Sequence, residues 1–244
     1  MKQRGFKEPH DLPRRFYKAV DVAPASEGFA VQLDGRTPKS PAGTPLVAPS
    51  ELLAGLVAEE WARQGEHILM ATMPATRLAW TALDRISEAH REVAEEVARF
   101  AGSDLVCYLA EEPPSLVERQ AAAWEPLRDW AAEELGVVLH AARGIVHRPQ
   151  PAASLLRAEK HAEALDDFAL AGLAHAAALF GSAVLAFALQ RRRLTGAEAF
   201  ELSRLDETFQ EERWGVDDEA AERTAALAAE AAMLDRWFAA LRLS

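Results

Sequence analysis

The chain has 244 residues, of which 50% are apolar, 7% are aromatic and 51 are alanine. This composition favours helices and argues against an all-β or disordered chain. A formal net charge of −11 disfavours nucleic acid as a partner, because an acidic surface repels phosphate backbones. The single cysteine, Cys107, excludes an intramolecular disulfide and a multi-cysteine metal cage, and fits a reducing compartment best.

The first 49 residues predict a small antiparallel β domain. Apolar-rich runs at 16–22 and 29–33 are typical of strands. Asp34-Gly35 follows the second run directly and signals a hairpin, because both central residues of a type I′ turn need positive φ. Four prolines then restrict the rest to edge strand or loop: Pro38, Pro41, Pro45 and Pro49. We expect a meander of three or four strands.

The first twenty residues of the chain are basic, and they have no apolar core of a secretory signal and no amphipathic Arg/Ser-rich helix. We therefore interpret them as an ordered or frayed terminus rather than a transit peptide.

Residues 50–244 predict a helical domain, because the hydrophobic period changes to about 3.6 after Pro49. Ser50 is expected to cap the first helix and Gly65 to end it. A capping box of Ser115 and Glu118 predicts another helix start, with a kink or a fresh start near Pro126. The remaining predicted elements are a helix over 76–100, a loop with an uncertain strand over 137–151, and helices over 154–193, 195–213 (with a capping box of Thr195 and Glu198) and 217–241.

Residues 168–189 carry no formal charge and, as one helix, would reach roughly 33 Å. A membrane span is one interpretation, with Arg191, Arg192 and Arg193 as a positive flank. Nine of the 22 residues are alanine, however, and His175 and Ser182 weaken insertion further. The segment therefore favours a helix buried at the centre of a bundle over a stable membrane insertion.

The sequence has no signature of a phosphate-binding loop, a dinucleotide fold, a nucleophile elbow or a zinc protease. No two of the seven histidines are spaced i, i+4 on one helix, which argues against a metal site. Cys107 lies in an apolar run and is interpreted as a buried structural thiol. Glu59-Glu60 point about 100° apart on a helix and are interpreted as part of a solvated face. We expect no catalytic residue, cofactor or metal.

Three polar segments stand out: 33–36 with Lys39, 73–79 and 205–220. In the third, Trp214 lies between two acidic clusters. An aromatic anchor surrounded by charge is a common form of partner site. Composition alone favours a simpler interpretation, a solvated helix end followed by acidic residues at the start of the next helix.

In their order along the chain, these segments resemble the F-type ATP synthase assembly chaperones that bind the α subunit of the catalytic head. The match covers most of the chain and includes Arg15-Phe16-Tyr17-Lys18, Leu33-Asp34-Gly35-Arg36, Glu59-Glu60-Trp61, Thr76-Arg77-Leu78-Ala79, Gln120, Trp124 and Trp214-Gly215. Two positions depart from the family pattern: Leu109 stands in place of an arginine, and Glu125 in place of an aspartate.

The resemblance implies an α+β protein of two domains, a β-meander over 1–49 and a larger helical domain over 50–244. It implies a chaperone rather than an enzyme, with the unassembled α subunit as its client until the β subunit replaces it. The expected protein is a monomer of the bacterial cytoplasm, equivalent to relatives in the mitochondrial matrix.

As a hypothesis, we assign six residues within 205–220 to partner binding: Glu207, Gln210, Glu211, Trp214, Asp217 and Glu219. Their charges would pair with basic groups of the client. Four others are assigned to the core or to the junction of the domains: Arg36, Trp61, Arg77 and Trp124. Two alternatives stay open, an enzyme of an unrecognised class and a membrane-associated scaffold that uses 168–189 as a span.

Overall fold

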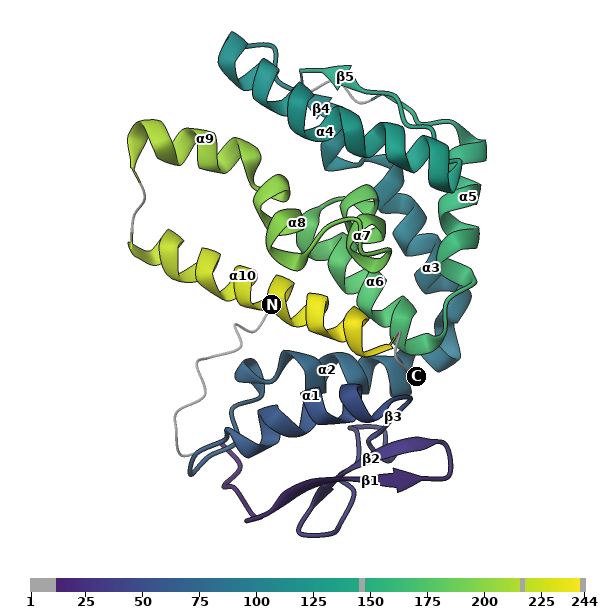
Figure 1. Ribbon diagram of the computed structural model, residues 1–244, viewed down its shortest axis with the longest axis vertical. Coiled ribbons are helices and arrows are strands. Elements are labelled where there is room, and N and C mark those ends of the chain that lie inside the picture. The colour runs from purple at the N-terminus through teal and green to yellow at the C-terminus, as the bar shows by residue number, and fades with distance from the viewer. Residues whose placement is uncertain (1–11, 145–147, 216–217, 242–244) are drawn as a thin grey trace, which may run out of the picture. The chain divides into compact units, whose positions relative to one another are not determined.

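The computed structural model describes residues 12–144, 148–215 and 218–241 (Figure 1). Contacts divide the chain into two compact units, one that ends at Asp84 and takes in the chain from Ala240 onward, and one over Arg85–Ala239. The change from strand to helix falls at residue 50, whereas the contacts group the first two α-helices with the sheet. A small antiparallel sheet followed by a larger helical region confirms the predicted fold class.

The sheet of the first unit is antiparallel in the order β1-β2-β3, and its strands are β1 (Val20–Ala25), β2 (Gly28–Leu33) and β3 (Val47–Ala48). The turn between β1 and β2 follows Ala25, which pairs with Gly28. Asp34 and Gly35 do form a tight turn with φ of 49° and 76°, but it joins Leu33 only to an isolated bridge at Arg36. The predicted hairpin position was therefore wrong, although the turn itself is present.

Two α-helices complete the first unit, α1 (Glu51–Ala62) and α2 (Pro74–Thr81), with a short 3-10 turn, η2 (Met70–Thr72), between them. The Ser50 hydroxyl accepts a hydrogen bond from the Leu53 amide at 3.1 Å, which confirms the predicted cap. A π-helical segment, η3 (Ala82–Ile86), follows α2. The single helix predicted over 76–100 was wrong, because η3 and a non-helical Ala89 interrupt it.

Glu60 is a buried carboxylate that caps α2 from α1, so the prediction that it lies on a solvated face was wrong. It accepts hydrogen bonds from the amides of Ala75 and Thr76, both at 2.7 Å, and from the Thr76 hydroxyl at 2.8 Å. Burial raises the pKa of Glu60, and these hydrogen bonds oppose that rise. Because the donors are the free amides of a helix N-terminus, the carboxylate fixes where α2 begins.

The second unit consists of eight helices within the described ranges, with a parallel two-stranded ladder at one side (Figure 1). The helices are α3 (Ser87–Gly102), α4 (Pro114–Leu135), α5 (Ala152–Glu163), α6 (Asp167–Phe180), α7 (Ala183–Gln190), α8 (Gly196–Ser203), α9 (Leu205–Trp214) and α10 (Asp218–Leu241). A 3-10 turn, η4 (Leu105–Cys107), leads into the ladder of β4 (Tyr108–Leu109) and β5 (Ala142–Arg143). The uncertain strand within 137–151 is thus present as β5.

Helix starts and breaks in this unit differ from the predictions at two places. α4 begins directly after Pro113, and no side chain forms a capping hydrogen bond at the start of this helix. The predicted capping box of Ser115 and Glu118 was therefore wrong. α4 also continues through Pro126 as one helix, so the alternative of a fresh start there was wrong. At α8, by contrast, the predicted capping box of Thr195 and Glu198 is present with both of its reciprocal contacts.

The uncharged segment 168–189 forms two helices rather than one. α6 ends at Gly181, whose φ of 62° reverses the chain, and Ser182 caps α7. Within the described residues, none of the helices has the length and apolar character that crossing a membrane requires. Every residue of α7 except Gln190 is buried, and α7 contacts α3, α4, α6 and α8. The prediction of one long central helix was wrong, but its residues do lie at the centre of this unit.

Asp104 caps α7 from outside the helix. Its fully buried carboxylate accepts hydrogen bonds from the Ser182 hydroxyl at 2.5 Å and from the amides of Val184 and Val106 at 3.0 and 3.3 Å. Burial raises the pKa of Asp104 to about 6, against the opposing effect of these hydrogen bonds. The segment before η4 and the junction of α6 with α7 are thereby joined by one acidic group.

The raised pKa of Asp104 predicts a pH-dependent stability. Since the pKa of about 6 in the folded protein exceeds the ordinary aspartate pKa of 3.8, this contribution is full below about pH 4 and is lost as the pH rises through 6. Relative to Asp104→Asn, the unfolding free energy of the wild type should fall by about 1.4 kcal/mol between about pH 5 and 7.5. Urea titrations at both pH values measure this difference, and an equal difference at both would contradict the assignment.

Trp61 is 4% exposed and packs edge to face against Tyr17 and Trp80, with ring centroids 5.7 and 6.4 Å away. Trp61→Ala should lower the stability of the first unit by about 3–5 kcal/mol, because it leaves a large cavity. The melting temperature should therefore fall by several degrees. Trp214→Ala is the control, because Trp214 is 77% exposed and its truncation should leave the melting temperature unchanged.

Candidate functional site

One face of α9 carries four of the six residues assigned to partner binding. Glu207, Gln210, Glu211 and Trp214 are spaced i, i+3, i+4 and i+7, so they share the side of the helix opposite Leu205. Glu207 and Gln210 are exposed, and Trp214 is 77% exposed. We call these four residues the acidic patch.

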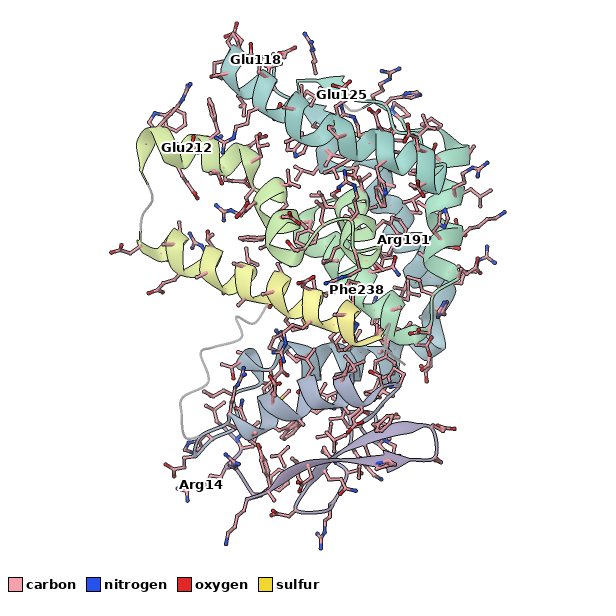
Figure 2. The ribbon with its side chains drawn as sticks, viewed as in Figure 1. Arg14, Glu118, Glu125, Arg191, Glu212 and Phe238 are labelled. Atoms are coloured by element: carbon pink, nitrogen blue, oxygen red, sulfur yellow. The ribbon has the colours of Figure 1, made fainter. Side chains whose placement is uncertain are left out.

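The opposite face of α9 attaches the helix to α4. Leu205 and Phe209 are buried there. At one end of the helix, the Gln120 amide donates to the Asp206 carboxylate at 2.7 Å. At the other end, Arg119 pairs with Glu212 at 2.9 Å, and Figure 2 shows Glu212 on α9, which lies below α4 in that view. These contacts orient the acidic patch away from α4.

The remaining two assigned residues lie beyond α9. Asp217 is outside the described residues. Glu219 lies in the first turn of α10 and pairs with Arg223 of the same helix at 2.5 Å. Within the acidic patch, Glu211 is half-buried and pairs with Arg204 at 2.6 Å, and Arg204 also donates to Thr224 of α10 at 2.5 Å. Glu211 therefore contributes to holding α9 as well as to the surface.

A groove of about 560 Å³ lies between α4 and α8, on the side of α9 that carries Leu205 and faces away from the acidic patch. Its two acidic residues, Glu198 and Glu201, are exposed on α8. Its lining consists of Arg119, Ala123, Leu194, Glu198, Glu201, Leu202, Leu205 and Thr208. No sequence pattern predicts this groove, because its walls come from helices more than 60 residues apart and no local signal indicates that they meet.

The described residues offer little for catalysis. They contain no cluster of three His, Cys, Asp or Glu side chains placed to hold a metal ion. Cys107 is buried, and its burial together with the neighbouring Asp104 raises the pKa of the thiol to about 12. A thiol that stays protonated is a poor nucleophile.

The four residues assigned to the core or the junction differ in their surroundings. Trp61 and Trp124 are buried, and the Trp124 indole donates to the Leu202 carbonyl at 3.1 Å, which joins α4 to α8. Arg36 is exposed after the tight turn, and Arg77 is exposed on α2. The structure thus places the two tryptophans in the cores of separate units and the two arginines on the surface.

Comparisons with known proteins decide the family. A family model described as the ATP12 chaperone protein matches residues 14–132. The crystal structure of Atp12 from Paracoccus denitrificans superimposes with a TM-score of 0.85 at 38% identity, covering 93% of this chain and 97% of that chain. The chain belongs to the ATP12 chaperone family. It is a chaperone of ATP synthase assembly, and the resemblance drawn from the sequence is confirmed.

Two further relatives extend over most of this chain. A protein of Agrobacterium tumefaciens, Atu1473, described as a candidate chaperone, matches with a TM-score of 0.87 at 40% identity and covers 94% of this chain and 87% of its own. The mitochondrial protein atp12 of Schizosaccharomyces pombe is 29% identical over 227 residues, which is 88% of this chain and 78% of that protein. The family thus has bacterial and mitochondrial members.

Gln120 should control how firmly α9 is held. It is fully buried, accepts a hydrogen bond from the Ala110 amide at 2.7 Å and donates to Asp206. Gln120→Ala removes both hydrogen bonds and leaves the Ala110 amide and the Asp206 carboxylate without this partner. The local opening free energy of α9 should therefore fall by about 1–3 kcal/mol. Hydrogen exchange of the α9 amides measures this change, with the exposed Gln210→Ala as control. Unchanged exchange in Gln120→Ala would contradict the attachment.

Proposed function

We propose that this protein binds the unassembled α subunit of the F-type ATP synthase catalytic head and shields its interface until the β subunit replaces it. Family membership supports an assembly role, and the acidic patch supplies a surface suited to a protein client. Such a chaperone must release its client to the true partner. A surface with an apolar centre and a polar rim fits an interface of modest affinity.

The observation that carries this proposal is the exposure of Trp214. A tryptophan that is 77% exposed leaves a large apolar area in water, and tryptophan is among the residues most often found as binding hot spots. Carboxylates of Glu207 and Glu211 lie on the same face of α9. The proposed client therefore offers an apolar pocket for the indole, with basic groups around it.

We further propose that the protein acts as a monomer in the bacterial cytoplasm and needs no cofactor or catalytic turnover. The bacterial relatives in Paracoccus and Agrobacterium support the compartment. The mitochondrial relative in Schizosaccharomyces pombe supports the matrix as the equivalent place in eukaryotes.

Capture of the isolated α subunit tests the proposal. The full chain, immobilised on a surface, should bind purified α subunit but not purified β subunit. Trp214→Ala should weaken the binding at least tenfold, because it removes the apolar anchor of the patch. Phe16→Ala is the matched control, since Phe16 is a comparably exposed aromatic residue, at 72%, that lies in the first unit.

Two results would count against the proposal. If the wild-type chain does not capture the α subunit, the assignment of the client fails. If the chain captures it and Trp214→Ala binds as tightly as Phe16→Ala, the client is bound but the acidic patch is not where it binds.

A further inference from the structure

The groove between α4 and α8 is preformed. Three contacts fix its walls: the Trp124 indole to the Leu202 carbonyl at 3.1 Å, Gln120 to Asp206 at 2.7 Å, and Arg119 to Glu212 at 2.9 Å. They run from α4 to α8 and to both halves of α9, so the separation of these helices is set by hydrogen bonds as well as by packing. A preformed site loses less conformational entropy when it is occupied.

The floor of the groove is apolar. Leu205 is buried beneath it, and Ala123, Leu194 and Leu202 are half-buried. The volume of about 560 Å³ is within the range of about 300–1,000 Å³ that is typical of binding pockets. A floor of methyl groups favours an apolar side chain over a polar ligand. A polar ligand would give up its hydrogen bonds to water on entry, and the floor offers few groups that could replace them.

The rim of the groove is acidic. Glu198 is held in place by the Thr195 amide and hydroxyl, at 2.7 and 2.9 Å, and these hydrogen bonds lower its pKa and keep it ionised. Glu201 is exposed one turn further along α8. The one basic residue of the lining, Arg119, is already paired with Glu212. Within the lining, the carboxylates of Glu198 and Glu201 therefore outnumber the one cation, and Arg193 acts on Glu198 from outside the lining.

We propose that this groove binds an amphipathic segment of the client, with an apolar side chain on the floor and a Lys or Arg within about one helical turn of it facing Glu198 and Glu201. This inference rests on the proposed function and adds a second contact to it, because the groove and the acidic patch lie on different sides of α9. A helix laid into a groove between two helices is a common mode of peptide recognition.

Two test variants, each with a matched control, show whether the client occupies the groove. Ala123→Phe fills the floor, and Ala122→Phe places the same ring on the exposed neighbouring position. Glu201→Gln removes one rim charge without changing shape, and Glu125→Gln removes the same charge from an exposed position of α4 that does not line the groove (Figure 2). Circular dichroism melts establish that each variant is folded before binding is measured.

The measurement is the affinity of each full-length variant for purified α subunit at low and at physiological salt. Ala123→Phe should weaken binding at least tenfold and Ala122→Phe should not. Glu201→Gln should weaken it about twofold to fivefold at low salt and less at physiological salt, because salt screens an exposed charge. The charge pair keeps the test valid if Ala123→Phe does not fold.

The outcomes separate the two proposals. If the wild-type chain does not bind the α subunit, the proposed function fails and the groove proposal fails with it. If the wild type binds, Trp214→Ala weakens binding and the groove variants match their controls, the function stands and the groove proposal is overturned. Loss of binding in Ala123→Phe with no effect of Glu201→Gln at either salt would overturn the basic character assigned to the segment.

Discussion

A buried carboxylate at the start of α7 is the interaction on which the second unit depends. Asp104 accepts hydrogen bonds from Val106, Ser182 and Val184, and through them it connects the entry of η4 to the break between α6 and α7. Burying this charge is costly, as its raised pKa indicates. The compensation is directional, because a carboxylate at a helix N-terminus satisfies amides that an apolar side chain would leave unpaired. Glu60 does the same for α2 in the first unit.

The surfaces offered to a partner follow from the position of α7. α7 is buried against four helices, and the chain passes from it directly into α8 and then α9. α4 contacts α7, and also reaches α8 through Trp124 and α9 through Gln120. The groove and the acidic patch thus lie on two sides of α9, which contacts to α4 hold in place. In the proposed function, the client meets a fixed surface whose two contacts both combine an apolar centre with carboxylates.

Much of this was predictable where the signal is local. The strand-to-helix change at residue 50, the cap at Ser50 and the capping box at Thr195 depend on neighbours in sequence, and each is present. The break at Gly181 was missed because an uninterrupted apolar run hides a reversal that one glycine allows. The hairpin was misplaced because Asp34-Gly35 forms the expected turn without a strand to follow it.

The candidate site was predictable only on one side. The acidic patch is spaced at helical intervals within ten residues of sequence, so its common face could be inferred. The groove combines Ala123 of α4 and Leu202 of α8, which are brought together by long-range contacts of Trp124 and Gln120. Long-range contacts of buried polar groups have no period and no fixed spacing, and sequence patterns do not reveal them.

Whether the client binds across α8 and α9 can be measured by hydrogen exchange of the full chain, alone and in complex with purified α subunit. On binding, exchange should slow in α8 and α9, over Gly196–Trp214, and in the part of α4 around Ala123, with β1 and β2 unchanged. Slower exchange confined to the sheet, or a stable complex with no change in α8 and α9, would contradict binding at these helices.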